Sequence, residues 1–107
     1  MAALSNQQCR RDAVALDTDE QTRLLSQLHH DWQLQAGTLQ RRFEFSNYYQ
    51  TLAFINAVAQ VAHKQDHHPD ICFGYRQCDI HYRTHSADGI TLNDFICAAK
   101  IDLIDAL

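Results

Sequence analysis

The sequence lacks the C-x-x-C spacing, although it contains four cysteines, Cys9, Cys72, Cys78 and Cys97. Without that spacing, neither a zinc knuckle nor a thioredoxin-type redox motif is expected. None of the four cysteines lies in a motif that would activate its thiol. We therefore expect a cytoplasmic protein whose thiols are reduced.

Long apolar runs are also missing. The N-terminal sequence MAALSNQQCRRD is too polar to contain the apolar core of a signal peptide. No stretch approaches the roughly 20 apolar residues that a membrane-spanning helix needs. The sequence therefore predicts a cytoplasmic protein that has no membrane partner.

An excess of positive charge is absent as well. The formal net charge is −4 and the isoelectric point is near 5.9. Proteins that bind nucleic acid present a basic face to the phosphates. Nucleic acid is therefore not an expected partner.

The 107 residues of the chain fit one small domain. Residues 1–15 are polar and weakly patterned, so we expect a tail at 1–15 and a single domain at 16–107. An apolar share of 46% is enough for one core but leaves little surplus, so an oligomer would add stability.

A capping-box spacing marks the first predicted helix. Thr18 precedes Gln21 by three residues, and Asp19 and Glu20 suit the positive start of a helix. A helix is therefore expected over residues 17–30.

The next segment predicts a hairpin and then a long helix. Polar and apolar residues alternate over 32–36 and 39–45, on either side of Gly37, as in two short paired strands. Ser46 is a good N-cap, and residues 47–65 carry a wide apolar face at helical spacing. This helix is the best candidate for a core element.

The C-terminal part predicts two more strands and a last helix. Pro69 disfavours helical geometry in the residue before it, so the long helix must end by then. Strands are expected at 71–75 and 78–85, and a helix at 91–106. Alternation in the second of these strands gives one buried face: Cys78, Ile80, Tyr82 and Thr84.

The predicted order of elements is α-β-β-α-β-β-α. Two hairpin-like pairs of strands separated by a helix favour an α+β domain. We expect a four-stranded antiparallel sheet with the helices packed on one face.

Histidines are concentrated in the stretch HKQDHHPD. His63 and His67 are four residues apart, which would place both on one face of a helix. His81 and His85 would share one face of a strand, so four histidines could bind a metal. The zinc-protease pattern H-E-x-x-H has the helical spacing, but Lys64 stands in place of its general-base glutamate.

Two other interpretations of this stretch need no metal. A histidine near a helix C-terminus interacts favourably with the negative end of the helix dipole, so the stretch could be a polar helix end. Alternatively, imidazoles give and take protons near neutral pH, and adjacent aspartates would fix their tautomers. Composition alone does not choose among the three.

A larger constellation links this stretch to later residues: His67-His68-Pro69, Tyr75, His85 and Asp94. It resembles the signature of the pterin-4a-carbinolamine dehydratase family, and the similarity extends back to Leu16. The NDFI stretch and the Cys9-Arg10 tail resemble bacterial members most. The chain departs from many relatives at three places: His63 instead of glutamate, Ile71-Cys72 instead of a more aromatic pair, and Asn93 instead of arginine.

This resemblance implies a hydro-lyase that needs no cofactor and no metal. Its substrate would be 4a-hydroxytetrahydrobiopterin, which loses water from C4a and a proton from N5 to give quinonoid dihydropterin. The product would be recycled to tetrahydropterin for an aromatic amino acid hydroxylase, such as phenylalanine hydroxylase. The resemblance also implies a homodimer or homotetramer. The alternatives are a binding module that acts as a dimerisation or transcriptional cofactor and a metal-dependent hydrolase.

The resemblance also assigns roles to single residues. The catalytic set would be His67, His68 and His85, with the first and last as an acid/base pair and the second orienting the pterin. The substrate-binding set would be Asp66, Pro69 and Asp94. Two of these have structural alternatives, because Thr91 and Asp94 have a capping-box spacing and Pro69 could simply fix the exit from the helix.

Overall fold

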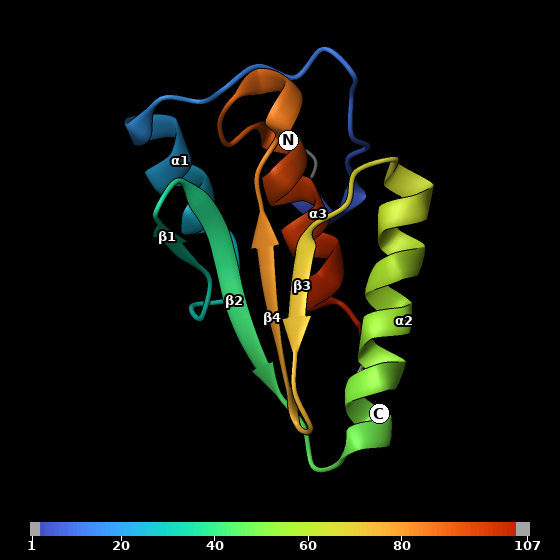
Figure 1. The fold of residues 1–107 in the computed structure, drawn as a ribbon. Coiled ribbons are helices and arrows are strands. Elements are labelled where there is room, and N and C mark those ends of the chain that lie inside the picture. The colour runs from blue at the N-terminus through green and yellow to red at the C-terminus, as the bar shows by residue number, and fades with distance from the viewer. Residues whose placement is uncertain (1–2, 105–107) are drawn as a thin grey trace.

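A four-stranded antiparallel sheet organises the computed structural model, which describes residues 3–104 (Figure 1). Its spatial order is β1-β2-β4-β3, so the two central strands come from different hairpins. In the register of the sheet, Ile80 lies between Arg41 on one side and Ile71 on the other. The strands are β1 (Gln33–Gln35), β2 (Thr38–Glu44), β3 (Asp70–Phe73) and β4 (Gln77–Tyr82).

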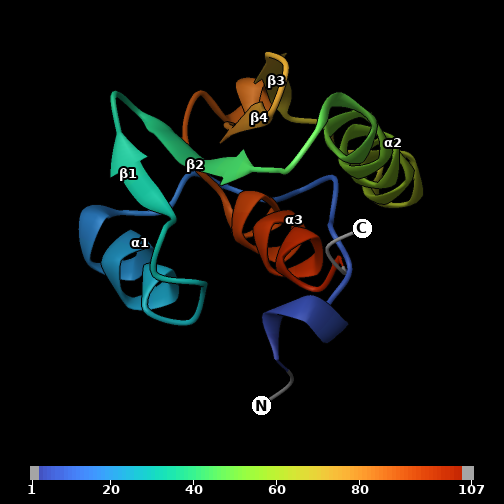
Figure 2. The ribbon, with the colours of Figure 1, turned by 90° about the horizontal axis from the view of Figure 1, so that it is seen from below.

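Three helices cover one face of the sheet, as the view from below shows (Figure 2): α1 (Thr18–Leu25), α2 (Tyr48–Gln65) and α3 (Leu92–Asp102). The predicted fold class, α+β with helices on one face, is therefore confirmed. The predicted apolar side of β4 is confirmed too, because Cys78, Ile80 and Tyr82 are fully buried. Among residues 3–104, no helix combines the length and apolar character needed to span a membrane.

The first helix begins where it was expected, but its capping pair and its end differ from the prediction. Its N-cap is Asp17, whose Oδ1 accepts a hydrogen bond from the Glu20 backbone N–H at 2.8 Å, so the capping box lies one residue earlier than expected. The helix ends at Leu25 instead of residue 30. The His29 backbone N–H donates to Asp102 at 3.1 Å, a tertiary contact that takes this segment out of a helical path.

The second helix begins one residue late and ends where it was expected. Asn47, and not Ser46, is the N-cap, and its side chain accepts a hydrogen bond from the Gln50 backbone N–H at 2.9 Å. The last helical residue is Gln65. Asn47 sits where its carboxamide oxygen reaches the third helical N–H, so the prediction of Ser46 as the cap is wrong by one residue.

The last strand and helix are shorter than predicted. Strand β4 ends at Tyr82, and the segment expected to extend it forms a short 3-10 turn, His85–Ala87, closed by a bridge between Thr84 and Gly89. Helix α3 ends at Asp102, and residues 105–106 of the predicted helix lie outside the described residues.

The N-terminal segment packs along α3. Leu4 is 4% exposed and belongs to the core. The Lys100 ammonium donates to the Ser5 carbonyl at 2.8 Å, and the Arg10 backbone N–H donates to the Asn93 side chain at 2.9 Å. The polar pattern of this segment gave no sign of these contacts, and the division of the chain at residue 15 stays a prediction.

Candidate functional site

The end of α2 determines where His67 lies. Asp66 has the left-handed conformation (φ 51°), and the His67 N–H donates to the Ala62 carbonyl at 3.1 Å, which is the closing bond of a Schellman-type helix end. Aspartate is one of the few residues other than glycine that adopt this conformation readily. Because the chain reverses here, His63 and His67 do not share a helix face, and that prediction is wrong.

His67 is directly bonded to Asp94. Its Nε2 lies 2.6 Å from Asp94 Oδ1, and its ring stacks on that of Tyr82 with centroids 5.6 Å apart. The His67 side chain is 13% exposed, and that of Asp94 is fully buried. The imidazole is therefore fixed on one edge and one ring face, with a small part reachable from solvent.

Asp94 performs two structural tasks at once. Its Oδ2 accepts hydrogen bonds from the Thr91 backbone N–H and from the Thr84 hydroxyl, both at 2.9 Å, while Oδ1 holds His67. The predicted capping box between Thr91 and Asp94 is confirmed. The bond to His67 brings together two residues that are 27 positions apart, so no local spacing could have indicated it.

The electrostatics of the pair favour a protonated imidazole. Burial lowers the pKa of His67, but the hydrogen bond and the charge of Asp94 outweigh burial, so the pKa of His67 is raised above its ordinary value. With the Nε2 proton directed at Asp94, Nδ1 of a neutral His67 carries a lone pair, whereas Nδ1 of the charged form carries a proton. The same nitrogen can therefore act as a base or as an acid.

The other predicted site residues are neighbours in the chain of His67 or of Thr84, and they differ in exposure. Asp66 and His68 are exposed neighbours of His67 in the chain, and Pro69 is buried at the entry to β3. His85 is exposed and follows Thr84, whose hydroxyl binds Asp94. His85 begins the 3-10 turn, so the prediction that it shares a strand face with His81 is wrong.

Two residues of the site were missed by the sequence analysis, Tyr82 and Thr84. Both were placed correctly on the buried face of their strand segment, where Thr84 is 7% exposed. A threonine on an otherwise apolar face was the available signal, because buried hydroxyl groups almost always have a hydrogen-bond partner. The identity of that partner depended on the position of α3.

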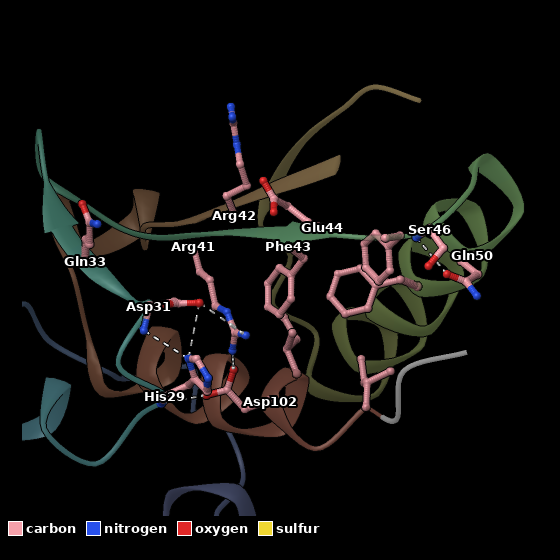
Figure 3. A pocket seen from close by; sticks show the side chains of 14 residues that line it. His29, Asp31, Gln33, Arg41, Arg42, Phe43, Glu44, Ser46, Gln50 and Asp102 are labelled. Carbon is pink, nitrogen blue, oxygen red and sulfur yellow. Dashed lines mark hydrogen bonds and ion pairs between the residues drawn. The ribbon is translucent and has the colours of Figure 1, made fainter. Parts of the chain in front are cut away.

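A large hollow lies elsewhere in the molecule, and Figure 3 shows the side chains that line it. Its volume is about 890 Å³, and none of the predicted site residues lines it. Arg41 reaches from β2 to Asp102, with Nη1 at 2.7 Å from Oδ1, and its guanidinium lies 4.1 Å from the centre of the Phe43 ring. Since Arg41 and Asp102 neutralise each other, we place the candidate site at His67 and Asp94, where an acid/base group is available.

Possible metal ligands gather at a different place from the one the histidine spacings suggested. Within residues 3–104, the one group of three candidate ligands with atoms within 4.8 Å of one another is His29, His30 and Asp31, which are exposed. The histidine pairs that are four residues apart in the sequence do not form such a group in the described part of the chain.

Comparisons with known proteins agree on one family. The sequence model of the family described as pterin 4 alpha carbinolamine dehydratase matches residues 14–104. A protein of Nitrosomonas eutropha that carries the provisional name pterin-4-alpha-carbinolamine dehydratase is 50% identical over 96 residues, which cover 90% of this chain and 85% of the relative.

Solved structures of similar fold add two relatives. A transcriptional coactivator/pterin dehydratase from Brucella melitensis superposes with a TM-score of 0.77 at 30% identity, covering 81% of this chain and 94% of that one. A pterin dehydratase-like protein identified as a RuBisCO assembly factor in the alpha-carboxysome has a TM-score of 0.60 at 31% identity, covering 69% and 88%.

Proposed function

The chain belongs to the pterin 4 alpha carbinolamine dehydratase family, and on that basis we propose that it dehydrates 4a-hydroxytetrahydrobiopterin. The reaction breaks the C4a–O bond and removes the N5 proton, and the products are water and quinonoid dihydropterin. An acid must protonate the leaving hydroxyl group, and a base must accept the N5 proton. Neither step involves a change of redox state, so the side chains of the protein can supply both groups.

The observation that carries this proposal is the 2.6 Å contact between His67 and the buried Asp94. A buried carboxylate fixes the orientation of the imidazole and stabilises its charged form, as an orienting acid does for a catalytic histidine. The raised pKa of His67 increases the fraction of the imidazole that is protonated near neutral pH. His67 is therefore suited to donate a proton to the leaving hydroxyl group and to recover it afterwards.

The remaining roles follow from the family resemblance and from exposure. His85 would be the facing acid/base partner, since its exposed ring follows a residue that binds Asp94. His68 would bind and orient the pterin, with Asp66 and Pro69 at the same chain reversal. Asp94 would act through His67, because its carboxylate is fully buried.

The domain limits, oligomeric state, location and partners of the enzyme are proposed from the sequence and the family resemblance. Residues 16–107 would form the dehydratase domain, preceded by the segment 1–15. We expect a cytoplasmic homodimer or homotetramer whose product serves a pterin-dependent hydroxylase, such as phenylalanine hydroxylase. Neither nucleic acid nor a membrane is an expected partner, and neither a cofactor nor a metal is expected to be required.

A dehydration assay tests the proposed activity directly. The substrate is 4a-hydroxytetrahydrobiopterin, generated in the cuvette by an aromatic amino acid hydroxylase, and the appearance of quinonoid dihydropterin is followed by absorbance. We expect the purified chain to accelerate this step equally before and after treatment with a chelator. A rate equal to the spontaneous one would refute the proposal, and activity lost on chelation and restored by zinc would favour the hydrolase-like metal chemistry instead.

A binding role is the second candidate function. Two structural relatives are described as a transcriptional coactivator/pterin dehydratase and as a RuBisCO assembly factor, so the fold also occurs in proteins with a described binding role. The two candidates predict different results when the wild type is compared with a His67→Ala and His85→Ala double variant. A purely binding protein would show no dehydratase activity even before these changes, whereas the enzyme would lose its activity because of them.

A further inference from the structure

Two cysteines from opposite ends of the sequence are in contact beside the candidate site. Cys9 Sγ lies 3.5 Å from Cys97 Sγ, although the residues are 88 positions apart. Cys9 belongs to the N-terminal segment and is half-buried, and Cys97 is fully buried in the middle of α3. The pair therefore joins two parts of the chain that local structure does not hold together.

Hydrogen bonds fix both cysteines in this arrangement. The Cys9 backbone N–H donates to the Gln65 side chain at 2.8 Å, near the end of α2. The Cys9 thiol also lies 3.6 Å from the Asn93 carbonyl, and the Cys97 thiol lies 4.0 Å from the His67 carbonyl. The Cys97 sulfur thus lies against the backbone of His67, and the Cys9 sulfur lies against that of Asn93.

The two thiols have opposite acidities. The pKa of Cys9 is lowered, chiefly because the Cys97 thiol donates a hydrogen bond to it, and the charges of His67 and Lys100 add to this effect. The same hydrogen bond, together with burial, raises the pKa of Cys97. Cys9 is thus the more readily ionised thiol, and it is the more exposed residue of the two.

We propose that Cys9 and Cys97 form a reversible intramolecular disulfide when the protein meets a peroxide, and that this bond fastens the N-terminal segment to α3. A disulfide needs a sulfur–sulfur distance of about 2.05 Å, so the two atoms must approach by roughly 1.5 Å. The N-terminal segment around Cys9 is neither helix nor strand and can supply this movement while α3 stays in place. The inference does not depend on the proposed dehydratase activity.

The chemistry balances with the peroxide as the only co-reactant. The Cys9 thiolate attacks one peroxide oxygen, the O–O bond breaks, and the departing oxygen leaves as water after taking up a proton. The Cys97 sulfur then attacks the sulfur of the Cys9 sulfenic acid, the S–O bond breaks, and a second water leaves with the Cys97 proton. Two thiols lose two electrons in total, and the peroxide is reduced to two waters.

Trypsin separates all four cysteines, which makes the bond easy to identify. Cleavage after Arg10, Lys64, Arg76, Arg83 and Lys100 places Cys9 in peptide 1–10, Cys72 in 65–76, Cys78 in 77–83 and Cys97 in 84–100. The folded protein is treated with hydrogen peroxide, its remaining thiols are blocked, and the digest is analysed by mass spectrometry without reductant. We expect a linked species of peptides 1–10 and 84–100 that disappears on reduction.

A variant with Cys72→Ser provides the background, since Cys72 is exposed and could link two molecules. In this background the oxidised protein should melt several degrees higher than the reduced protein, because the bond closes a long loop. Adding Cys9→Ser should remove both the linked peptides and this difference in Tm. Oxidation of Cys9 to a sulfinic acid with Cys97 still reduced would overturn the proposal, and so would a link that forms only in denaturant.

Discussion

At the scale of single residues, burial and a neighbouring charge act in opposite directions on the pKa of His67. Burial alone would lower the pKa of an imidazole, and Asp94 reverses the direction. Asp94 can remain charged in the interior because three hydrogen bonds satisfy its oxygens, from His67, Thr84 and Thr91. The acid/base properties of His67 therefore depend on one carboxylate that makes no contact with solvent.

Removal of that charge should reverse the pKa shift. In the wild-type protein, the NMR titration of His67 should give a pKa above its ordinary value of about 6.5. In an Asp94→Asn variant, burial is opposed only by the smaller effects of Cys9 and Asp66, and the pKa should fall below that value. The His67→Gln variant assigns the signal among the seven histidines. An unchanged pKa in the Asp94→Asn variant would contradict this account.

Stability should depend on pH with a sign that follows from the same shift. Because folding raises the pKa of His67, its contribution to stability is fully present below the unfolded pKa of about 6.5 and is lost as the pH rises through the folded pKa. The free energy of unfolding of the wild type should therefore exceed that of His67→Gln at pH 6 by more than at pH 8. Urea unfolding at both pH values measures this, and a difference that grows with pH would contradict it.

Substitution of His67 or His85 should lower turnover, whereas substitution of His68 should weaken substrate binding. If His67 and His85 transfer protons, their single alanine variants should lose turnover within the roughly 10²–10⁴-fold range of acid/base catalysis and keep some activity, because each can partly replace the other. The double variant should approach the uncatalysed rate. His68→Ala should mainly raise KM.

Circular dichroism provides the control for these variants, because each must retain the wild-type spectrum. A folded double variant with nearly wild-type turnover would refute acid/base catalysis at this site and return the histidines to the role of a polar helix end.

At the scale of elements, caps determine where the helices begin and end. Each of the three helices starts at a residue whose side chain accepts a backbone N–H: Asp17, Asn47 and Thr91. The end of α2 is set by Asp66 in its left-handed conformation, three residues before Pro69. That early reversal removes His67 from the helix and directs it to Asp94.

Replacing Asp66 should separate its backbone role from its proposed contact with the pterin. Asp66→Gly relieves the steric cost of the left-handed conformation and should stabilise the fold by about 0.5–1 kcal/mol. Asp66→Asn keeps a residue that tolerates this conformation and removes only the charge. If the carboxylate binds substrate, both variants should raise KM although neither lowers Tm. A fall in Tm for Asp66→Gly would refute the backbone argument.

At the scale of the whole molecule, α3 is the element against which the other parts assemble. The sheet covers one side of it, and the N-terminal segment runs along it through Leu4, Ser5 and Arg10. Ile101 of α3 is 1% exposed and Ile104 packs on the same core. Both isoleucines therefore cover the core of their own chain.

The N-terminal segment should contribute measurably to stability. Leu4 is 4% exposed in the core cluster, so Leu4→Ala should lower the free energy of unfolding by about 2–3 kcal/mol, as for other buried leucines. Val14→Ala is the matched control, because Val14 is 72% exposed, and it should change stability by less than about 0.5 kcal/mol. Equal effects of the two substitutions, measured by urea unfolding, would show that residues 1–15 form a loose tail.

Self-association is expected from a surface of exposed aromatic side chains. Tyr48 and Tyr75 stack with ring centroids 5.9 Å apart, and Tyr49 and Phe73 beside them in the chain are 80% and 46% exposed. A monomer of 12.3 kDa that exposes such aromatic side chains gains stability by covering them. Light scattering at micromolar concentration should give at least the mass of a dimer, and a monomer mass would reject this expectation.

The sequence by itself determined the class of fold, the buried face of β4 and the family. These three conclusions follow from short sequence patterns. The patterns are the alternation from Cys78 to Tyr82, the capping box at Thr91 and the histidine pair before Pro69. Hydrogen bonds between near neighbours and side-chain periodicity need no information about distant residues, so their signals are visible in a short window of sequence.

Only the tertiary structure decided the contacts that make the site. Asp94 meets His67 across 27 positions, Cys9 meets Cys97 across 88, and the His29 backbone leaves the path of α1 to reach Asp102. Each contact depends on how α3 lies against the sheet, which is set by the packing of the whole core. Because many residues determine that packing together, no spacing within the sequence could have predicted it.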